Sequence, residues 1–171
     1  MSTVPLLLTF AILTGAGWLD GPHGIAAEDC DPLVAEPIHA QVDFFAEIQP
    51  MIDVRCAPCH TQGSFGGMNL RPENIRENLL GTDETGAPSS YPGFLRVTPG
   101  DPLASLIFLR LNCDNAGSAD NPIPRMPPPD GTGTDLQALM HDWIALGAIL
   151  RGDDPAMQTD RLFLGRFDPI R

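Results

Sequence analysis

A single pentapeptide, Cys56-Ala57-Pro58-Cys59-His60, sets the strongest restriction on the fold of this chain. Cys-x-x-Cys-His is the attachment signature of c-type haem. Two thiols at this spacing can add to the two vinyl groups on one edge of the porphyrin, and the histidine that follows can bind the iron. We therefore expect one covalently bound haem c, with Cys56 and Cys59 as attachment points and His60 as the proximal iron ligand.

Three other chemistries use a Cys-x-x-Cys pair, and each lacks a companion feature here. A zinc site needs a second Cys or His pair at finger spacing, which neither His39 nor His141 supplies. A thioredoxin-like dithiol needs a βαβ setting, whereas the flanking segments have helical and loop patterns. A structural disulfide between Cys56 and Cys59 leaves His60 without a role. Haem attachment is the interpretation that uses all three residues.

Met126 is the strongest candidate for the second axial ligand because of the residues around it. It stands in the segment Pro124-Arg125-Met126-Pro127-Pro128-Pro129. Prolines hold a chain extended and stiff, so this segment can present a thioether at a fixed distance from iron. We expect Met126 to be the distal ligand. The neighbouring Arg125 is a candidate partner for a haem propionate, with a solvated surface arginine as the alternative.

Four other side chains compete for the distal position: Met68, Met140, His39 and His141. Met68 follows His60 by only eight residues, so its segment would have to pass around the porphyrin edge. Met140 shares a predicted helix face with Leu136 and Trp143, which favours a place in the core. Both histidines are expected to be solvated or packed.

The two remaining cysteines, Cys30 and Cys113, are predicted to form a disulfide. Haem attachment does not use them, and an oxidising compartment favours their pairing. The bond would close a long segment and stabilise the fold by about 4 kcal/mol in the chain-entropy model. Two free buried thiols are the alternative.

The N-terminus carries the only long apolar run, from Val4 to Leu19. At 16 residues it is short for a membrane span and is typical of a secretory signal, with a cleavage point after Ala27. We therefore expect export to the periplasm or an equivalent compartment. An uncleaved anchor is the alternative, and only then would the protein contact a membrane. Lipidation of Cys30 is disfavoured because Glu28 and Asp29 precede it.

The rest of the pattern predicts an all-α domain of four to five short helices joined by long loops. The chain has 17 glycines and 18 prolines, and no segment alternates convincingly at a period of two. Capping residues and apolar spacing place helices from Asp43 towards the pentapeptide with a break or restart at Pro50, over 72–80, from Pro102 to Leu111, and from a cap at Thr134 or Asp135 to Gly147.

The charge of the chain restricts its partners. There are 22 acidic and 10 basic side chains, which gives a net charge of −12, and every basic residue is an arginine. A polyanion is repelled by nucleic acid and by anionic membranes. We therefore expect no nucleic-acid partner, and a redox protein with a basic docking surface as the natural complement.

Several spaced motifs together resemble the planctomycete-type cytochrome c domain, a branch of the class I cytochrome c fold. They are Phe45-x-x-Ile48-Gln49-Pro50, Arg55-Cys56-x-x-Cys59-His60, Gly67-x-x-Leu70, Pro99-Gly100-Asp101-Pro102-x-x-Ser105, Arg125-Met126-Pro127-Pro128 and Trp143-Ile144-x-x-Gly147-Ala148. The resemblance implies a class I cytochrome c-like fold around one haem, with His60 proximal and Met126 distal. It also implies terminal helices packed against each other and a partly exposed haem edge.

These observations divide the chain into a signal peptide (1–27), an N-terminal extension (28–42), a cytochrome c domain (43–148) and a C-terminal tail (149–171). The expected function is single-electron transfer by an exported carrier that is not itself an enzyme. A fixed cytochrome subunit of a larger periplasmic redox assembly is the alternative, and an open iron that binds gases or peroxide is a third.

The acidic insert from Asn112 to Asn121 departs from the family pattern. We expect Asx-rich turns there rather than a calcium site, and the insert would either staple the distal loop or form a docking surface. The apolar residues of the tail suit a strap over the domain or a contact with a partner subunit.

Overall fold

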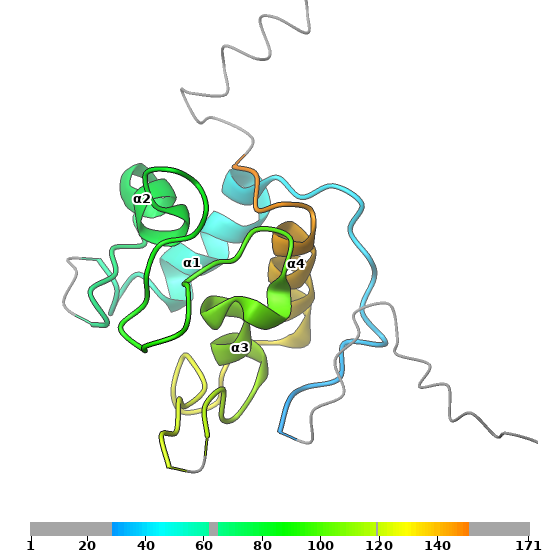
Figure 1. Cartoon of the computed structure of the whole chain (residues 1–171). Coiled ribbons are helices and arrows are strands. Elements are labelled where there is room, and N and C mark those ends of the chain that lie inside the picture. The colour runs from blue at the N-terminus through cyan, green and yellow to red at the C-terminus, as the bar shows by residue number, and fades with distance from the viewer. Residues whose placement is uncertain (1–28, 62–64, 119, 151–171) are drawn as a thin grey trace, which may run out of the picture.

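A computed structural model describes residues 29–61, 65–118 and 120–150 (Figure 1). The predicted signal peptide and the tail from Arg151 lie outside these ranges. The described residues form four α-helices, with two short 3-10 segments and one π-helical turn, and no strand beyond isolated bridges. The predicted all-α fold with four to five short helices is thus confirmed. Within the same ranges, no helix is long and apolar enough to cross a membrane.

The first helical unit combines a π-helical turn, η1 (Phe44–Ile48), with α1 (Gln49–Arg55). Asp43 caps it as predicted, because its carboxylate accepts a hydrogen bond from the amide of Ala46. The change of helix type falls between Ile48 and Gln49, next to Pro50, which has no amide hydrogen to continue a regular ladder. The amide of Gln49 instead donates to the carbonyl of Phe44, five residues back. The predicted restart at Pro50 therefore appears as a π-turn followed by an α-helix.

The two middle helices are short. The 3-10 turn η2 (Pro72–Asn74) leads into α2 (Ile75–Leu80), and Gly81 ends it at a φ of +75°, in agreement with the predicted helix over 72–80. The helix predicted from Pro102 is wrong in one respect. It is split into η3 (Pro102–Ala104) and α3 (Leu106–Asn112), with Ser105 extended between them.

Tertiary hydrogen bonds explain this break. The amides of Leu106 and Ile107 donate to the carbonyls of Leu95 and Arg96, both at 3.0 Å. The Ser105 hydroxyl donates to the carbonyl of Asp101 at 2.7 Å. Groups that would have bonded within one helix are satisfied by other parts of the chain, and a sequence pattern does not show this competition.

The last helix, α4 (Thr134–Ala145), packs against the first unit. Its N-cap is Gly133, not the predicted Thr134 or Asp135, and no side chain caps it. The buried rings of Phe44 and Trp143 lie 4.6 Å apart between their centroids and join η1 to α4 in the core. The expected contact between the first and last helices is therefore present.

The N-terminal extension belongs to the folded unit. It runs past α4 before entering η1, blue to cyan in Figure 1. Leu33 is buried in the core, and His39 bonds to the buried carboxylate of Asp142 through its backbone amide (2.7 Å) and its Nδ1 (3.0 Å). Further towards the N-terminus, Cys30 and Cys113 form the predicted disulfide.

The acidic insert after α3 folds back on itself. The Asn115 side-chain oxygen accepts hydrogen bonds from the amides of Gly117 and Ile123, both at 2.9 Å, which is the Asx-type turn expected there. Asn115 also forms an isolated antiparallel bridge with Pro124. With the disulfide at Cys113, these bonds staple the insert to the segment that carries Met126.

Candidate functional site

Two adjoining cavities lie where α1, α3, α4 and the proline-rich segment meet. The first contains about 720 Å³ free of protein atoms, part of it open to solvent, and apolar side chains such as Ile52, Leu111 and Leu136 line it. The predicted haem residues line this cavity together: Cys56, Cys59, His60 and Met126. Cys59, His60 and Met126 also line the second cavity. The structure thus brings both ends of the predicted haem site, 66 residues apart between His60 and Met126, to one hollow.

The attachment motif forms a tight turn at the end of α1. The amide of Cys56 donates to the carbonyl of Ile52, and the amide of His60 donates to the carbonyl of Cys56 at 3.0 Å. Cys56 is half-buried and Cys59 exposed, and they are not bonded to each other. Burial raises the pKa of the Cys56 thiol to about 11, so this thiol is neutral in the free chain.

The ring of His60 is held in the orientation that an iron ligand needs. Its Nδ1 lies 2.9 Å from the carbonyl oxygen of Phe65. A carbonyl only accepts hydrogen bonds, so Nδ1 carries the proton and Nε2 keeps its lone pair free. Burial also holds the pKa of His60 below its usual range, which favours the neutral ring. Metal-binding histidines typically donate a hydrogen bond from the ring nitrogen that does not bind the metal, often to a backbone carbonyl.

The structure narrows the choice of distal ligand without reducing it to one residue. Met68 and Met140 line the first cavity beside Met126. The two rival histidines do not: the Nδ1 atoms of His39 and His141 both lie 3.0 Å from the carboxylate of Asp142. Met140 is buried on α4, as predicted for a core residue.

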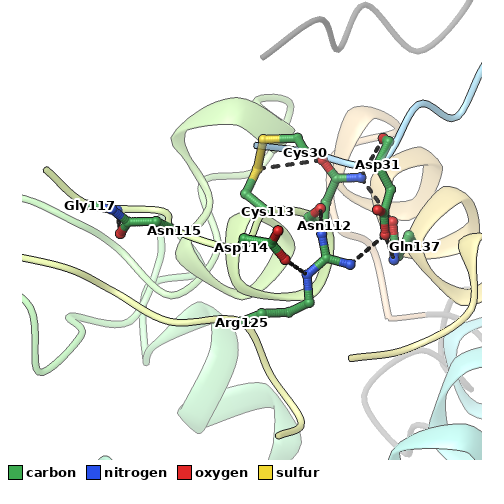
Figure 2. Close-up of a disulfide and its surroundings, with 9 residues drawn as sticks. All are labelled: Cys30, Asp31, Asn112, Cys113, Asp114, Asn115, Gly117, Arg125 and Gln137. Carbon is green, nitrogen blue, oxygen red and sulfur yellow. Dashed lines mark hydrogen bonds and ion pairs between the residues drawn. A yellow bond between two sulfur atoms is a disulfide. The ribbon is translucent and has the colours of Figure 1, made fainter. Parts of the chain in front are cut away.

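Arg125, which the sequence offered as a candidate propionate partner or a surface arginine, is held by other groups of the protein. It lines neither cavity. Its guanidinium lies 2.5 Å from a carboxylate oxygen of Asp31 and 3.0 Å from one of Asp114 (Figure 2), and it donates to the carbonyl of Asn112 at 2.6 Å. These partners hold the cation at the end of α3 and on the N-terminal extension. The same contacts raise the pKa of Arg125, mainly through the bond to Asp31.

The cations that do line the second cavity are Arg96 and Arg110, which the sequence did not single out. Arg96 donates to the carbonyls of Asn78 and Gly67, and its buried Nε has no hydrogen-bond partner within the described ranges. Arg110 donates to the carbonyl of Pro124 and lies 5.5 Å from the centre of the Tyr91 ring. Desolvation lowers the pKa of both arginines.

Neither arginine pairs with a carboxylate among the described residues. In a chain of net charge −12, two partly buried guanidinium groups without an acidic partner are unusual. An anionic ligand in the cavity would supply the missing charge. Haem carries two propionates, so the residues present fit the predicted group: two thiols, a neutral imidazole, thioethers and two unpaired cations around an apolar hollow.

Comparison with models of known protein families, with curated proteins and with solved structures found no match. Among the described residues, no group of three or more His, Cys, Asp or Glu side chains is placed to hold a metal ion. The predicted ligand pair, one imidazole and one thioether, does not use such a group.

Proposed function

We propose that this chain is an exported monohaem c-type cytochrome of the class I type that transfers single electrons between redox partners. One observation carries the proposal: Cys56, Cys59, His60 and Met126 line a single apolar cavity. The hydrogen bond from His60 to the carbonyl of Phe65 supports it, because it leaves Nε2 free for iron.

Each of these residues has a defined task. Cys56 and Cys59 would form thioether bonds to the porphyrin edge, and His60 and Met126 would hold the iron. The haem supplies the one-electron chemistry, and His/Met ligation favours its reduced state. Arg96 and Arg110 would pair with the propionates. The apolar walls would make the surroundings of the iron less polar, which also favours the less charged, reduced site.

Met126 is preferred over Met68 because of how the two segments are attached. The carbonyl of His60 accepts a hydrogen bond from the amide of Leu70 at 2.7 Å, so the segment with Met68 closes back on the proximal histidine. The amide of Met126 donates to the carbonyl of Arg110 at 2.6 Å, which fixes its segment to α3 instead. A ligand from a different element suits the face opposite His60.

Electron transfer needs a second protein, and the negative charge of the chain favours a basic partner. Opposite charges speed the encounter of two proteins, and added salt screens them. The second-order rate with a basic redox protein is therefore expected to fall as ionic strength rises.

A second candidate is a fixed cytochrome subunit of a larger periplasmic assembly. Exposed apolar side chains favour it: Val54 is 75% exposed and Phe65 62%, and Phe65 lines the second cavity. Co-purification with other chains at a constant ratio would support this function. A monomer that elutes alone and still exchanges electrons would support the mobile carrier.

The visible absorption spectrum of the exported protein, oxidised and reduced, tests the proposal. Methionine-ligated ferric haem shows a weak charge-transfer band in the red. We expect this band in the natural protein and its loss in Met126→Ala. A high-spin ferric spectrum would instead mean that the iron is open, and would favour gas or peroxide binding.

A further inference from the structure

We propose that Arg125 is a positioning residue for the distal ligand, and that Asp31 of the N-terminal extension is part of the distal site. The Cys30–Cys113 disulfide, Asp31 and Arg125, here called the clasp, hold the segment with Met126 against α3. The inference rests on the proposed function, since it concerns the ligand of that same iron.

The first step is the contact made by Arg125 itself. Its guanidinium bonds to Asp31 (2.5 Å) and to the carbonyl of Asn112 (2.6 Å), and its side chain is only 15% exposed. Gly131, at a φ of +72°, leaves room for it: a Cβ there would lie 2.6 Å from Arg125 Cδ. The amide of Arg125 donates to the carbonyl of Asp114 at 3.3 Å, so the residue before Met126 is fixed at both its backbone and its charged end.

Asp31 is the centre of the network that holds Arg125. The same carboxylate oxygen that meets Arg125 also accepts a hydrogen bond from the Gln137 amide on α4, at 2.7 Å. The side chain of Asn112, on α3, donates to the carbonyl of Asp31 and to Gln137, both at 2.9 Å. Asn112 and Gln137 are fully buried, so this network ties the distal segment to two helices in the interior.

The disulfide places Asp31 where Arg125 can reach it. Asp31 directly follows Cys30, and Cys30 is bonded to Cys113 beside the end of α3 (Figure 2). The amide of Asp31 donates to the carbonyl of Asn112 at 2.9 Å. That carbonyl belongs to the last turn of α3, which has no partner within its own helix. Asp31 and Arg125 both satisfy it.

Met126 is attached to the same helix end. Its amide donates to the carbonyl of Arg110, another carbonyl of the last turn of α3. Every step from Cys30 to Met126 is therefore a covalent bond or a hydrogen bond. A thioether is a weak axial ligand whose bond to iron depends on the position of its loop. Loosening the clasp should make Met126 easier to displace.

The test compares two carboxylates that both meet Arg125. Asp31 is 33% exposed and belongs to the buried network, whereas Asp114 is 78% exposed and does not. Asp31→Asn and Asp114→Asn remove the same charge, so they form a matched pair. The readouts are the affinity of the ferric protein for added imidazole, which displaces methionine, and the red charge-transfer band.

We expect Asp31→Asn to raise the imidazole affinity about tenfold, the size expected for loss of one partly buried charge-assisted hydrogen bond. Asp114→Asn should change it less than about twofold. Arg125→Gln serves as a second variant if Asp31→Asn does not fold, and it should match Asp31→Asn.

Three results would overturn the proposal. Unchanged imidazole affinity in Asp31→Asn and Arg125→Gln would show that the clasp does not act on Met126, while the red band and its loss in Met126→Ala would leave the cytochrome function intact. Equal effects of Asp31→Asn and Asp114→Asn on the imidazole affinity would mean that the lost negative charge, and not the buried network, causes the change. A natural protein without the red band would overturn the proposed function and the clasp together.

Discussion

The two sides of the candidate haem site are built in different ways. On the proximal side, Cys56, Cys59 and His60 are neighbours in sequence, and the hydrogen bonds of His60 join it to residues between Cys56 and Leu70. On the distal side, Arg125 beside Met126 bonds to Asp31, 94 residues away. Local chain geometry thus positions the proposed proximal ligand, and tertiary structure positions the proposed distal one. Substitutions on the proximal side should abolish haem attachment completely, whereas substitutions on the distal side should weaken ligation by degrees.

The largest effect is expected from removing the attachment thiols. The double variant Cys56→Ser/Cys59→Ser should lose all covalent haem, because serine does not form the thioether. Haem staining after denaturing electrophoresis measures this. The control is Cys30→Ser/Cys113→Ser, which should keep the stain; a stained Cys56→Ser/Cys59→Ser band would contradict the site assignment.

Next in size is Met126→Ala. The haem should remain attached, but the reduction potential should fall by roughly 0.1 V or more, within the span of about 0.8 V that axial ligation covers. Protein-film voltammetry or a mediated redox titration measures the reduction potential. Met140→Leu is the matched control, because it removes another cavity methionine that we assign to the core. If the red band were lost in Met140→Leu and kept in Met126→Ala, Met140 would be the distal ligand and Met126 would not.

The disulfide comes third. Its cysteines are 83 residues apart in sequence, and the chain-entropy model gives about 4 kcal/mol for a loop of that size. Cys30→Ser/Cys113→Ser should lower the free energy of unfolding by this amount, measured by denaturant titration with circular dichroism. A loss below about 1 kcal/mol would mean that the disulfide adds little to the buried hydrogen bonds around it.

A smaller effect is expected from Arg110→Gln. Removing a positive charge near the haem disfavours the reduced, less positive iron, so the potential should fall by roughly 50–100 mV, as for a unit charge about 10 Å away at an effective dielectric constant near 20. Arg76→Gln provides the control, since Arg76 pairs with Glu84 and lines neither of the two cavities. Equal potentials in the two variants would remove Arg110 from the propionate site.

The smallest effect is a pH dependence on the distal side. The hydrogen bond to Arg125 holds the pKa of Asp31 below its ordinary value of about 3.9. A depressed pKa in the folded state means that the stabilisation is complete above the unfolded value and is lost as pH falls through the folded one. We expect natural protein and Asp31→Asn to differ in unfolding free energy by about 1 kcal/mol at pH 7 and by less below pH 3. A difference that grows on acidification would contradict the assignment.

The sequence predicted what depends on local chemistry. The pentapeptide at a helix end, the cap at Asp43, the helix over 72–80 and the all-α class all follow from neighbouring residues. The disulfide was predictable because only Cys30 and Cys113 remained. The contacts of Arg125 with Asp31, and the positions of Arg96 and Arg110 beside the cavity, did not follow from the sequence, for one reason. The role of an arginine depends on which carboxylates lie near it in space, and no local pattern shows that Asp31 reaches Arg125 or that Arg96 and Arg110 have no acidic partner.

The disulfide also imposes an order on how the molecule is made. Any two of the four cysteines could form a single disulfide, and only the bond between Cys30 and Cys113 leaves both Cys56 and Cys59 free. The bond joins the first and last of these four cysteines, so during the proposed export Cys30 must stay reduced while Cys56 and Cys59 emerge before Cys113 does. If consecutive cysteines were oxidised as they emerge, Cys30 would form a disulfide with Cys56 instead of Cys113. Under the proposed function, correct maturation therefore requires that haem is attached at Cys56 and Cys59 first, or that a thiol-exchange step repairs the early error.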